Sequence, residues 1–332
     1  MKIVVTGALG HIGSRVIREI PKAFPEARVV LIDNLLTQRY CSLFNLPAEC
    51  DYRFIEADVL DADLNSIITG SDVVLHLAAI TDAASSFKNK DQVENVNYNA
   101  TVKVSGACKD AGVPLIHVSS TSVYGTQREI VDEACSPEDL RPQSPYAETK
   151  LKEEKFLQGM GHSGELDFVI CRFGTICGVS PGIRFHTAVN KFCWQAVMGQ
   201  PLTVWTTALH QKRPYLTLSD AVRALIFIMK KDLFDRTVYN VLTENLTVNA
   251  IIGFIAQRVA DLDIEYVDAE IMNQLSYEVS SLRFTKQGFQ FKGKVEDSVH
   301  KTLDLLEAAA SSRSLREEVK EKKMNVGNRQ RA

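Results

Sequence analysis

Apolar and polar positions divide the first half of the chain into short apolar runs separated by segments of helical period. Longer segments with apolar residues on one face read as helices, as Ile12, Val16, Ile17 and Ile20 do, and so do residues 91–111 and 146–160. Strands that alternate with helices predict a doubly wound parallel sheet, covered on both faces. The predicted strands are residues 2–5, 28–32, 52–56, 72–77, 115–118 and 168–172.

The pattern changes after Phe173, where the apolar runs become shorter and less regular. We expect a smaller, partly helical C-terminal region there, and a charged tail over residues 311–332 that is poor in apolar residues. A helix capped by Ser219 and Asp220 is expected to reach about residue 231. The other predicted elements are a glycine-rich loop at 174–182, helices at 185–199 and 248–259, and strands at 202–205, 215–218 and 238–241.

Composition excludes several classes of protein. The 332 residues carry a net charge of −3, which argues against nucleic acid or an anionic membrane as a partner. The seven cysteines are scattered without a C-x-x-C pair, as in a cytosolic protein with reduced thiols and no metal site. The chain starts on a core strand rather than a signal peptide, and no apolar run approaches the roughly twenty residues that span a bilayer. We therefore expect a soluble, cytoplasmic protein.

A glycine turn joins the first strand to the first helix. Gly7, Gly10 and Gly13 are spaced G-x-x-G-x-x-G, Pro21 and Pro25 are expected to close the helix, and the second strand leads to Asp33. A turn without side chains lets the backbone approach a pyrophosphate, and the N–H groups at a helix start point at it. An acid about twenty residues later accepts hydrogen bonds from ribose hydroxyls and would repel a 2′-phosphate. This arrangement predicts a Rossmann-like domain that binds NAD rather than NADP.

Ligands of an open parallel sheet bind outside the carboxyl ends of its strands. Polar or small residues follow the predicted strands at these ends. They are residues 7–13, Asp33, Asp58, Ala78, Ala79, Ser119, Ser120 and residues 173–178. We expect them to form one site.

Tyr146 and Lys150 lie four residues apart, on one face of a predicted helix. A lysine ammonium beside a tyrosine lowers the pKa of the phenol by favouring the phenolate. Such a tyrosine can take a proton from a sugar hydroxyl while hydride leaves the same carbon. Ser120, at the end of the fifth strand, could hold the reacting oxygen. The alternative interpretation is a helix start with a half-buried tyrosine and a solvated lysine.

Taken in order, the motifs resemble those of the extended short-chain dehydrogenase/reductases. More narrowly, they resemble the NAD-dependent epimerase/dehydratase family that acts on nucleotide sugars, over residues 1 to about 305. The motifs that carry the resemblance are residues 6–13, 33–35, 58–59, 76–79, Asn97, 119–120, 123–125, Tyr146 with Lys150, Arg172 and 213–215.

The resemblance implies NAD as cofactor and a role for each matching residue. Tyr146 would be the catalytic acid and base, Lys150 would tune it, and Ser120 would orient the sugar hydroxyl. The implied cofactor residues are Gly7, Gly10, His11, Ile12 and Gly13 at the pyrophosphate, Asp33 and Asn34 at the ribose, Asp58 and Val59 at the adenine, Leu77 and Ala78 along the cofactor, Asn97, Tyr146 and Lys150. The implied substrate residues are Thr81, Ser120, Thr121, Thr175, Arg184, His186, Thr187 and Arg213. For Arg213 the alternative is a surface charge, and for His186 a surface or capping residue.

Departures from the family pattern narrow the reaction. Sugar 4,6-dehydratases carry Thr-Asp-Glu where this chain has Ser120, Thr121 and Ser122, so dehydration lacks its acid and base. Fucose-synthase-like 3,5-epimerases carry a cysteine where Ser122 stands. Thr175 replaces the usual asparagine, and Thr81 stands where galactose epimerases have a lysine. The remaining chemistry is oxidation at one carbon by Tyr146 and the cofactor.

The sequence therefore predicts an NAD-dependent nucleotide-sugar 4-epimerase that works through a 4-keto intermediate. Alternatives are a nucleotide-sugar 4-dehydrogenase or ketoreductase and, further off, a 4,6-dehydratase or a non-catalytic dinucleotide-sensing protein. The predicted division is an NAD-binding domain at 1–172 with return segments at about 215–245, a substrate-binding region at 173–310, and the tail. The resemblance also implies a homodimer formed by the helices at 91–111 and 146–160.

Overall fold

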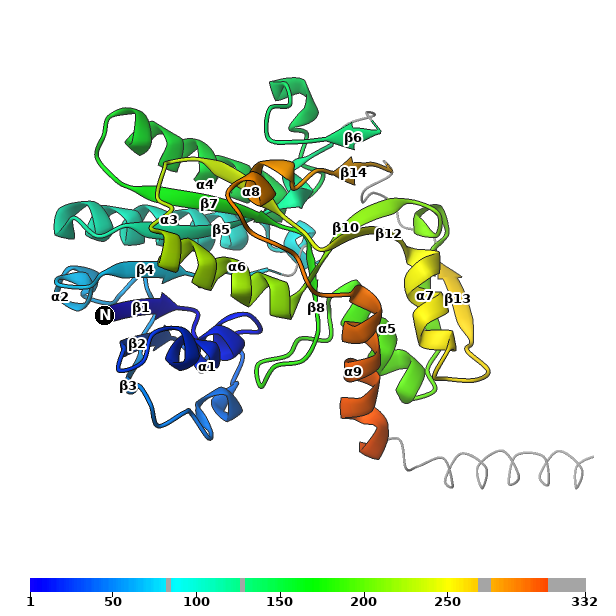
Figure 1. Cartoon of the computed structure of the whole chain (residues 1–332). Coiled ribbons are helices and arrows are strands. Elements are labelled where there is room, and N and C mark those ends of the chain that lie inside the picture. Colours follow the sequence, from blue (N-terminus) through cyan, green and yellow to red (C-terminus); the bar gives the residue numbers. More distant parts are fainter. Residues whose placement is uncertain (82–84, 126–128, 268–275, 310–332) are drawn as a thin grey trace, which may run out of the picture.

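The computed structural model describes residues 1–81, 85–125, 129–267 and 276–309. Its centre is a parallel sheet in the order β11-β7-β5-β4-β1-β2-β3 (Figure 1). The predicted Rossmann-like sheet is confirmed, and the order reverses between β1 and β4, which is where such sheets bind ligands. The strands are β1 (Lys2–Thr6), β2 (Arg28–Asp33), β3 (Asp51–Glu56), β4 (Val73–His76), β5 (Leu115–Ser120), β7 (Phe168–Phe173) and β11 (Val238–Val241).

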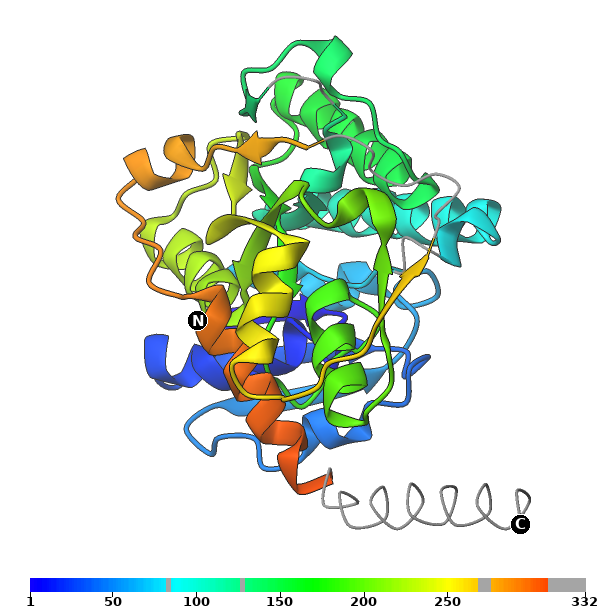
Figure 2. The same ribbon diagram turned by 90° about the vertical axis from the view of Figure 1, so that its right-hand side faces the viewer.

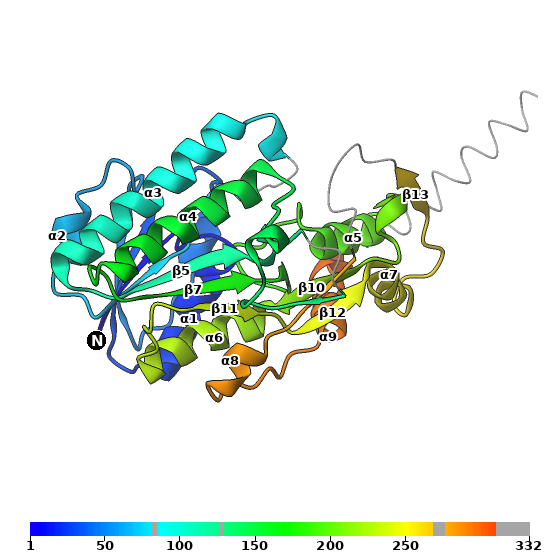
Figure 3. The same ribbon diagram turned by 90° about the horizontal axis from the view of Figure 1, so that it is seen from above.

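Both faces of this sheet are buried under helices (Figure 3). On β1, Ile3 and Val5 pack in the core that contains α1 (Gly13–Ala23) and α6 (Leu218–Lys231). Val4, between them, packs in the core on the opposite face, with α3 (Lys90–Ala111) and α4 (Pro145–His162). Successive residues of a strand point to opposite faces, which explains why these strands read as continuous apolar runs.

Of the two prolines that were predicted to close the first helix, Pro21 lies inside it, and the helix continues to Ala23. Proline has no N–H, so the carbonyl of Ile17, four residues earlier, loses its helical donor. The hydroxyl of Tyr52, on β3, donates to that carbonyl at 2.7 Å. A side chain from a neighbouring strand therefore takes the place of the missing N–H, and the helix ends only before Pro25.

Two other helix ends can be compared with their predicted caps. α3 ends at Gly112 in the left-handed conformation, with φ of 63°, as the glycine predicted. The cap of α6 is Thr217 rather than the predicted Ser219 and Asp220, because the Thr217 hydroxyl accepts from the backbone N–H of Asp220 at 3.2 Å. The strand β10 (Lys212–Thr217) therefore runs directly into the helix.

The C-terminal region packs its helices beside the carboxyl edge of the sheet. α5 (Ala188–Val197), α7 (Val248–Ala256) and α9 (Val295–Glu307) lie side by side in Figure 2 and share an apolar core. α9 was not predicted, although Val295, Val299, Leu303 and Leu306 repeat at helical spacing and are buried. The predicted tail lies outside the described residues.

Small sheets complete this region. β8 (Thr175–Cys177) lies inside the stretch predicted as a loop, because it pairs with β10, which also pairs with β12 (Glu244–Thr247). β9 (Leu202–Trp205) pairs with β13 (Ile264–Val267), and β6 (Ile130–Val131) with β14 (Glu278–Val279). The remaining elements are the helices α2 (Leu64–Ile68) and α8 (Leu282–Lys286), and 3₁₀ turns at Tyr40–Leu43, Ser85–Phe87, Thr121–Val123, Pro137–Asp139 and Thr206–Ala208. In the described ranges, no helix is both long and apolar enough to cross a membrane.

Candidate active site

A cleft of about 390 Å³ lies at the carboxyl ends of β1, β2, β4, β5 and β7. All but four of the site residues predicted from the sequence line it. Those that line it are Gly7, Gly10, His11, Ile12, Gly13, Asp33, Asn34, Asp58, Val59, Leu77, Ala78, Thr81, Ser120, Tyr146, Lys150, Thr175, Arg184 and Thr187. Asn97, Thr121, His186 and Arg213 do not.

The floor of the cleft is backbone, because the glycine turn has no room for side chains. Gly7 has a φ of +64°, and a Cβ there would lie 2.6 Å from the backbone nitrogen of Ala78. A Cβ on Gly13 would lie 2.4 Å from the carbonyl oxygen of Gly7. The turn leads directly into the first turn of α1, and the N–H groups of a helix start favour an anion. This cradle fits the pyrophosphate of a dinucleotide.

His11, inside this turn, ties it to the C-terminal region. Its Nε2 donates to the carbonyl of Gly178 at 2.8 Å, and the ring is 1% exposed. Burial lowers the pKa of His11 to about 3, so the ring is neutral at physiological pH. The hydrogen bond assigns the proton to Nε2 and leaves Nδ1 without it.

Two carboxylates stand where the adenosine part of a dinucleotide would lie. Asp33 is held by backbone N–H groups, from Leu9 to Oδ2 and from Leu35 to Oδ1, each at 3.0 Å. Asn34 donates to Asp58 Oδ2 at 2.8 Å. The fixed carboxylate of Asp33 fits ribose hydroxyls, as the sequence predicted.

Arg39 also lines this end of the cleft, close enough to Asp33 to interact electrostatically. The sequence interpretation did not include it. No local pattern could have found it, because the loop after Asp33 has neither helical nor strand period.

Tyr146 and Lys150 enter the cleft from the N-terminal turns of α4. The helix begins there because Ser144 accepts from the backbone N–H of Ala147 at 3.2 Å and Pro145 occupies the first helical position. Lys150 is 5% exposed, so it is not the solvated lysine of the alternative interpretation. Burial raises the pKa of the Tyr146 phenol, and the ammonium of Lys150 acts against this rise.

Ser120 faces the same cleft with its hydroxyl proton available. Its Oγ accepts from the backbone N–H of Ser122 at 3.1 Å and from the Ser122 hydroxyl at 2.8 Å. Because both bonds use Ser120 Oγ as the acceptor, its own O–H can donate to a ligand oxygen. Ser122 also lines the cleft and so orients the serine that was predicted to be functional.

The far end of the cleft is built by segments beyond the sheet. Arg184, in the loop before α5, donates to the hydroxyl of Thr81, which follows β4. The carbonyl of Arg184 accepts from the Asn190 side chain at 2.9 Å, which anchors the loop to α5. Thr175 on β8 and Thr187 at the start of α5 line the same end.

Two of the four predicted residues outside the lining serve the backbone instead. Asn97, on α3, bonds both backbone groups of Ile80, accepting from its N–H at 2.7 Å and donating to its carbonyl at 2.8 Å. It thus holds the segment after β4, which does line the cleft. The Thr121 hydroxyl donates to the carbonyl of Phe173 at 3.3 Å.

The other two do not line the cleft. His186 is exposed. Arg213, on β10, donates to the carbonyl of Lys212 at 2.9 Å and to Gln211 Oε1 at 2.6 Å. Its guanidinium also lies over the Tyr277 ring, 5.7 Å from the centroid. Their contact with a substrate stays a prediction.

Two consecutive glutamates beneath the cleft were missed by the sequence interpretation. The carboxylate of Glu154 accepts two hydrogen bonds from Arg172, from Nη2 to Oε2 at 2.6 Å and from Nε to Oε1 at 3.0 Å. Glu153 receives Lys150 Nζ at 2.9 Å, and His117 Nε2 lies 3.1 Å from the same oxygen. The available signal was their spacing, three and four residues after Lys150 on one helix face.

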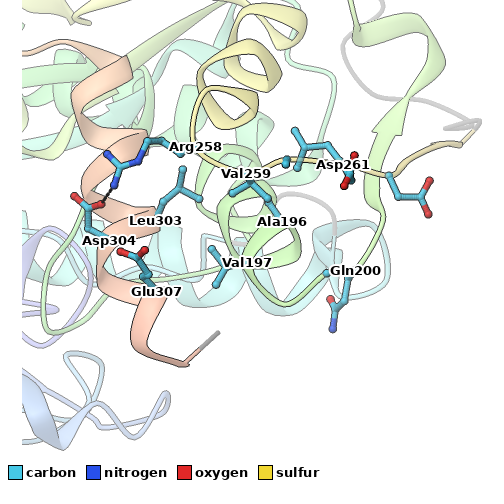
Figure 4. Close-up of a pocket in the computed structure, with 13 residues that line it drawn as sticks. Ala196, Val197, Gln200, Arg258, Val259, Asp261, Leu303, Asp304 and Glu307 are labelled. Carbon is cyan, nitrogen blue, oxygen red and sulfur yellow. Dashed lines mark hydrogen bonds and ion pairs between the residues drawn. The ribbon is translucent and has the colours of Figure 1, made fainter. Parts of the chain in front are cut away.

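A second cavity, of about 360 Å³, lies between the C-terminal ends of α5 and α7 and the last turns of α9 (Figure 4). Figure 4 shows Arg258 paired with Asp304 at one side of this cavity. Its lining shares no residue with the cleft at the sheet edge. Tyr146, Lys150 and the glycine cradle therefore line the first cleft and not this cavity.

Comparison with known proteins agrees with this geometry. The model of the NAD dependent epimerase/dehydratase family matches residues 3–241. An uncharacterized UDP-glucose epimerase, YtcB, of Bacillus subtilis (strain 168) is 33% identical over 240 residues, which cover 70% of this chain and 73% of that protein. The UDP-glucuronic acid 4-epimerase of Bacillus cereus, solved with UDP-glucuronic acid and NAD, is 26% identical, covers 93% of this chain and 100% of that one, and has a TM-score of 0.81.

A longer relative matches only in part. The trifunctional UDP-glucose 4,6-dehydratase, 3,5-epimerase and reductase RHM1 of Arabidopsis thaliana is 29% identical over 91% of this chain. The chain spans 46% of the length of that protein. The family match, the sheet order and the glycine cradle agree. The chain therefore belongs to the NAD-dependent epimerase/dehydratase family of extended short-chain dehydrogenase/reductases, as an enzyme of the nucleotide-sugar epimerase and oxidoreductase type with NAD as its cofactor.

Proposed function

We propose that the protein is a nucleotide-sugar 4-epimerase that oxidises C4 transiently and returns the hydride to the other face of a 4-keto sugar. The observation that carries the proposal is the meeting of Ser120, Tyr146 and Lys150 in the dinucleotide cleft, with no ionisable residue at positions 121 and 122. The UDP-sugar epimerases among the similar proteins support it.

In this mechanism Tyr146 moves the proton of the sugar hydroxyl. NAD, when bound, supplies the acceptor and later the donor of the hydride. Ser120 donates a hydrogen bond to the same sugar oxygen and so keeps it within reach of the phenol. The proton returns from Tyr146 after the keto sugar has turned, because the same two groups serve both faces.

The hydroxyls that replace the dehydratase acids support epimerisation over loss of water. Thr121 donates to the backbone of Phe173, and Ser122 donates to Ser120. Neither ionises near neutral pH, so neither can remove a proton from C5 or protonate a leaving hydroxyl at C6. We propose that Arg184 faces the charged part of the substrate, since it lines the far end of the cleft.

The test is proton NMR of UDP-, GDP-, CDP- and dTDP-sugars incubated with the protein and catalytic NAD. A sugar inverted at C4 with NAD unchanged is the expected result, and it would name the substrate. A keto sugar formed only in proportion to added NAD would make the enzyme a 4-dehydrogenase. A new C6 methyl signal would make it a dehydratase and contradict the role given to positions 121 and 122.

Replacement of Tyr146 should remove the chemistry and spare the binding of NAD. We expect Tyr146→Phe to lower turnover by roughly a thousandfold, within the range of general acid–base catalysis. NAD affinity, measured by calorimetry, should change little because the glycine cradle is untouched. Tyr98→Phe is the matched control, since Tyr98 lies on α3 against Phe156 and outside the cleft lining. Near-normal turnover by Tyr146→Phe would refute the mechanism.

A further inference from the structure

We propose that Glu153 is a positioning residue of the proton-transfer site: its buried carboxylate holds the Lys150 ammonium and offsets its charge, so that Tyr146 remains a phenol until a cation binds beside it. The inference rests on the proposed function only for the role of Tyr146. It adds a residue that does not line the cleft and acts through one that does.

The contact between the two side chains is short and closed to solvent. Lys150 Nζ lies 2.9 Å from Glu153 Oε2, and the side chains are 6% and 0% exposed. The two residues are one helical turn apart on α4, so the geometry needs no bending of the helix. His117, on β5, brings Nε2 within 3.1 Å of the same oxygen and is itself fully buried. One ammonium and one imidazole therefore both lie against Oε2 of the carboxylate.

Both members of the pair are charged. Burial would raise the pKa of the Glu153 carboxyl, but Lys150 and His117 bring it down to about 2. Burial would lower the pKa of Lys150, but Glu153, Tyr146 and Glu154 together outweigh burial and the pKa rises. Lys150 and Glu153 therefore face Tyr146 as a buried pair with no net charge.

The histidines behind the pair carry no charge where a tyrosine titrates. Burial lowers the pKa of His76, on β4, to about 3, and it also lowers the pKa of His117. Thr6 Oγ1 accepts from the backbone N–H groups of Leu77 and Ala78, each at 3.2 Å. Its proton therefore goes to His76 Nδ1, 2.7 Å away, which leaves the His76 proton on Nε2.

Two other charged side chains, Glu154 and Arg184, lie near this site. The negative charge of Glu154, the next residue of α4, is offset by its bidentate ion pair with Arg172. Arg184, from the loop before α5, is a second cation near the phenol. Among the described residues, Glu153 is therefore the carboxylate that weakens the effect of Lys150 on Tyr146.

This arrangement has a consequence for catalysis. A lone ammonium would favour the phenolate at all times, whereas a neutralised ammonium leaves the phenol as the resting state. The positive charge of oxidised nicotinamide would then lower the pKa of the Tyr146 phenol and favour loss of its proton. The same tyrosine would regain its proton donor character when that charge is lost. An acid–base group that must work in both directions benefits from this dependence.

The test is the titration of Tyr146 in Glu153→Gln, which removes the charge and keeps the shape. Tyrosines carrying carbon-13 at Cζ report their own protonation by NMR, and Tyr146→Phe identifies the signal of Tyr146 among the nine tyrosines. We expect the Tyr146 midpoint in Glu153→Gln to fall by about one pH unit relative to the wild type. Glu148→Gln makes the same charge change on an exposed side of α4 and should leave the midpoint in place.

A second variant separates charge from shape. Glu153→Asp keeps the carboxylate but withdraws it from Lys150, so its midpoint should lie between those of the wild type and Glu153→Gln. Any other order of the three midpoints would overturn the proposal, as would an unchanged midpoint in Glu153→Gln. Because the readout needs no turnover, a shifted midpoint in a protein that acts on no nucleotide sugar would refute the proposed function alone. An active enzyme with an unshifted midpoint would refute this inference alone.

Discussion

At the scale of single residues, the site depends on side chains that are absent as much as on those present. Gly13 must lack a Cβ because the carbonyl of Gly7 lies where that atom would be. Gly106, inside α3, has open space at the same point. The two glycines therefore differ in what a methyl group would meet, although the sequence alone gives both the same letter.

The first residue-scale prediction uses this matched pair. Gly13→Ala should lower the free energy of unfolding by about 1–3 kcal/mol through overpacking and weaken NAD binding severalfold, because the turn must shift. Gly106→Ala should raise the free energy of unfolding by about 0.5–1 kcal/mol, since alanine favours helix at an open position. Urea unfolding and calorimetry with NAD check both. A Gly13→Ala protein that binds NAD like the wild type would contradict the cradle.

The residues that line the cleft could be predicted from the sequence where they come directly after a strand or are spaced by one turn of a helix. Tyr146 and Lys150 were predicted from their spacing, and they line the cleft. Glu153 was not, because a glutamate in a charged helix reads as a solvated residue until its burial is known. Arg213, on β10, was predicted as a substrate contact; it does not line the cleft, and its contact with a substrate stays a prediction.

At the scale of elements, α1 shows how a helix survives an internal proline. The Tyr52 hydroxyl satisfies the Ile17 carbonyl that Pro21 leaves without a donor. Tyr52 and Ile17 are 35 residues apart, so no local pattern could reveal the bond. The prediction that Pro21 helps to close the helix was wrong for that reason, whereas the helix does end before Pro25.

A double-mutant cycle tests this bond. Tyr52→Phe should lower the free energy of unfolding by about 1 kcal/mol, the usual net value of a hydrogen bond to a part-buried carbonyl. In a Pro21→Ala background the new alanine N–H can reach the Ile17 carbonyl, so the same Tyr52→Phe change should cost measurably less. Urea unfolding of the four proteins gives the coupling. Equal losses in both backgrounds would show that the hydroxyl does not replace the missing N–H.

At the scale of the whole molecule, buried histidines couple folding to pH. His11 and His76 both have a pKa of about 3 in the folded protein because burial disfavours their charged forms, against 6.5 when unfolded. The unfolded chain therefore binds more protons below pH 6.5, and stability is lost as the pH falls from 6.5 toward 3. Glu153, with a pKa of about 2, adds a further loss below about 4.5.

This linkage predicts how steeply the free energy of unfolding falls as the pH is lowered. Between pH 6 and 5, each of the two histidines should contribute about 1.2 kcal/mol to the fall in the free energy of unfolding. His76→Gln should remove its share, so that its stability falls less steeply with acid than that of the wild type. Exposed His162→Gln is the control for loss of a histidine. Parallel pH profiles of the wild type and His76→Gln, from urea unfolding, would refute the burial of a neutral His76. The homodimer and the division into domains stay predictions at this scale.

The sequence by itself determined the parallel sheet, the glycine turn, Asp33 and the Tyr146 and Lys150 pair. These features depend on short-range period and spacing, and a strand buried on both faces or a side-chain-free turn leaves a local signature. The tertiary structure alone decided that α1 passes through Pro21, that Arg39 enters the cleft and Arg213 does not, and that Glu153 and His117 enclose the charge of Lys150. The physical reason is that each of these depends on a contact between segments far apart in the chain, or on burial from water. A local stretch of sequence reveals neither the long-range contact nor the burial.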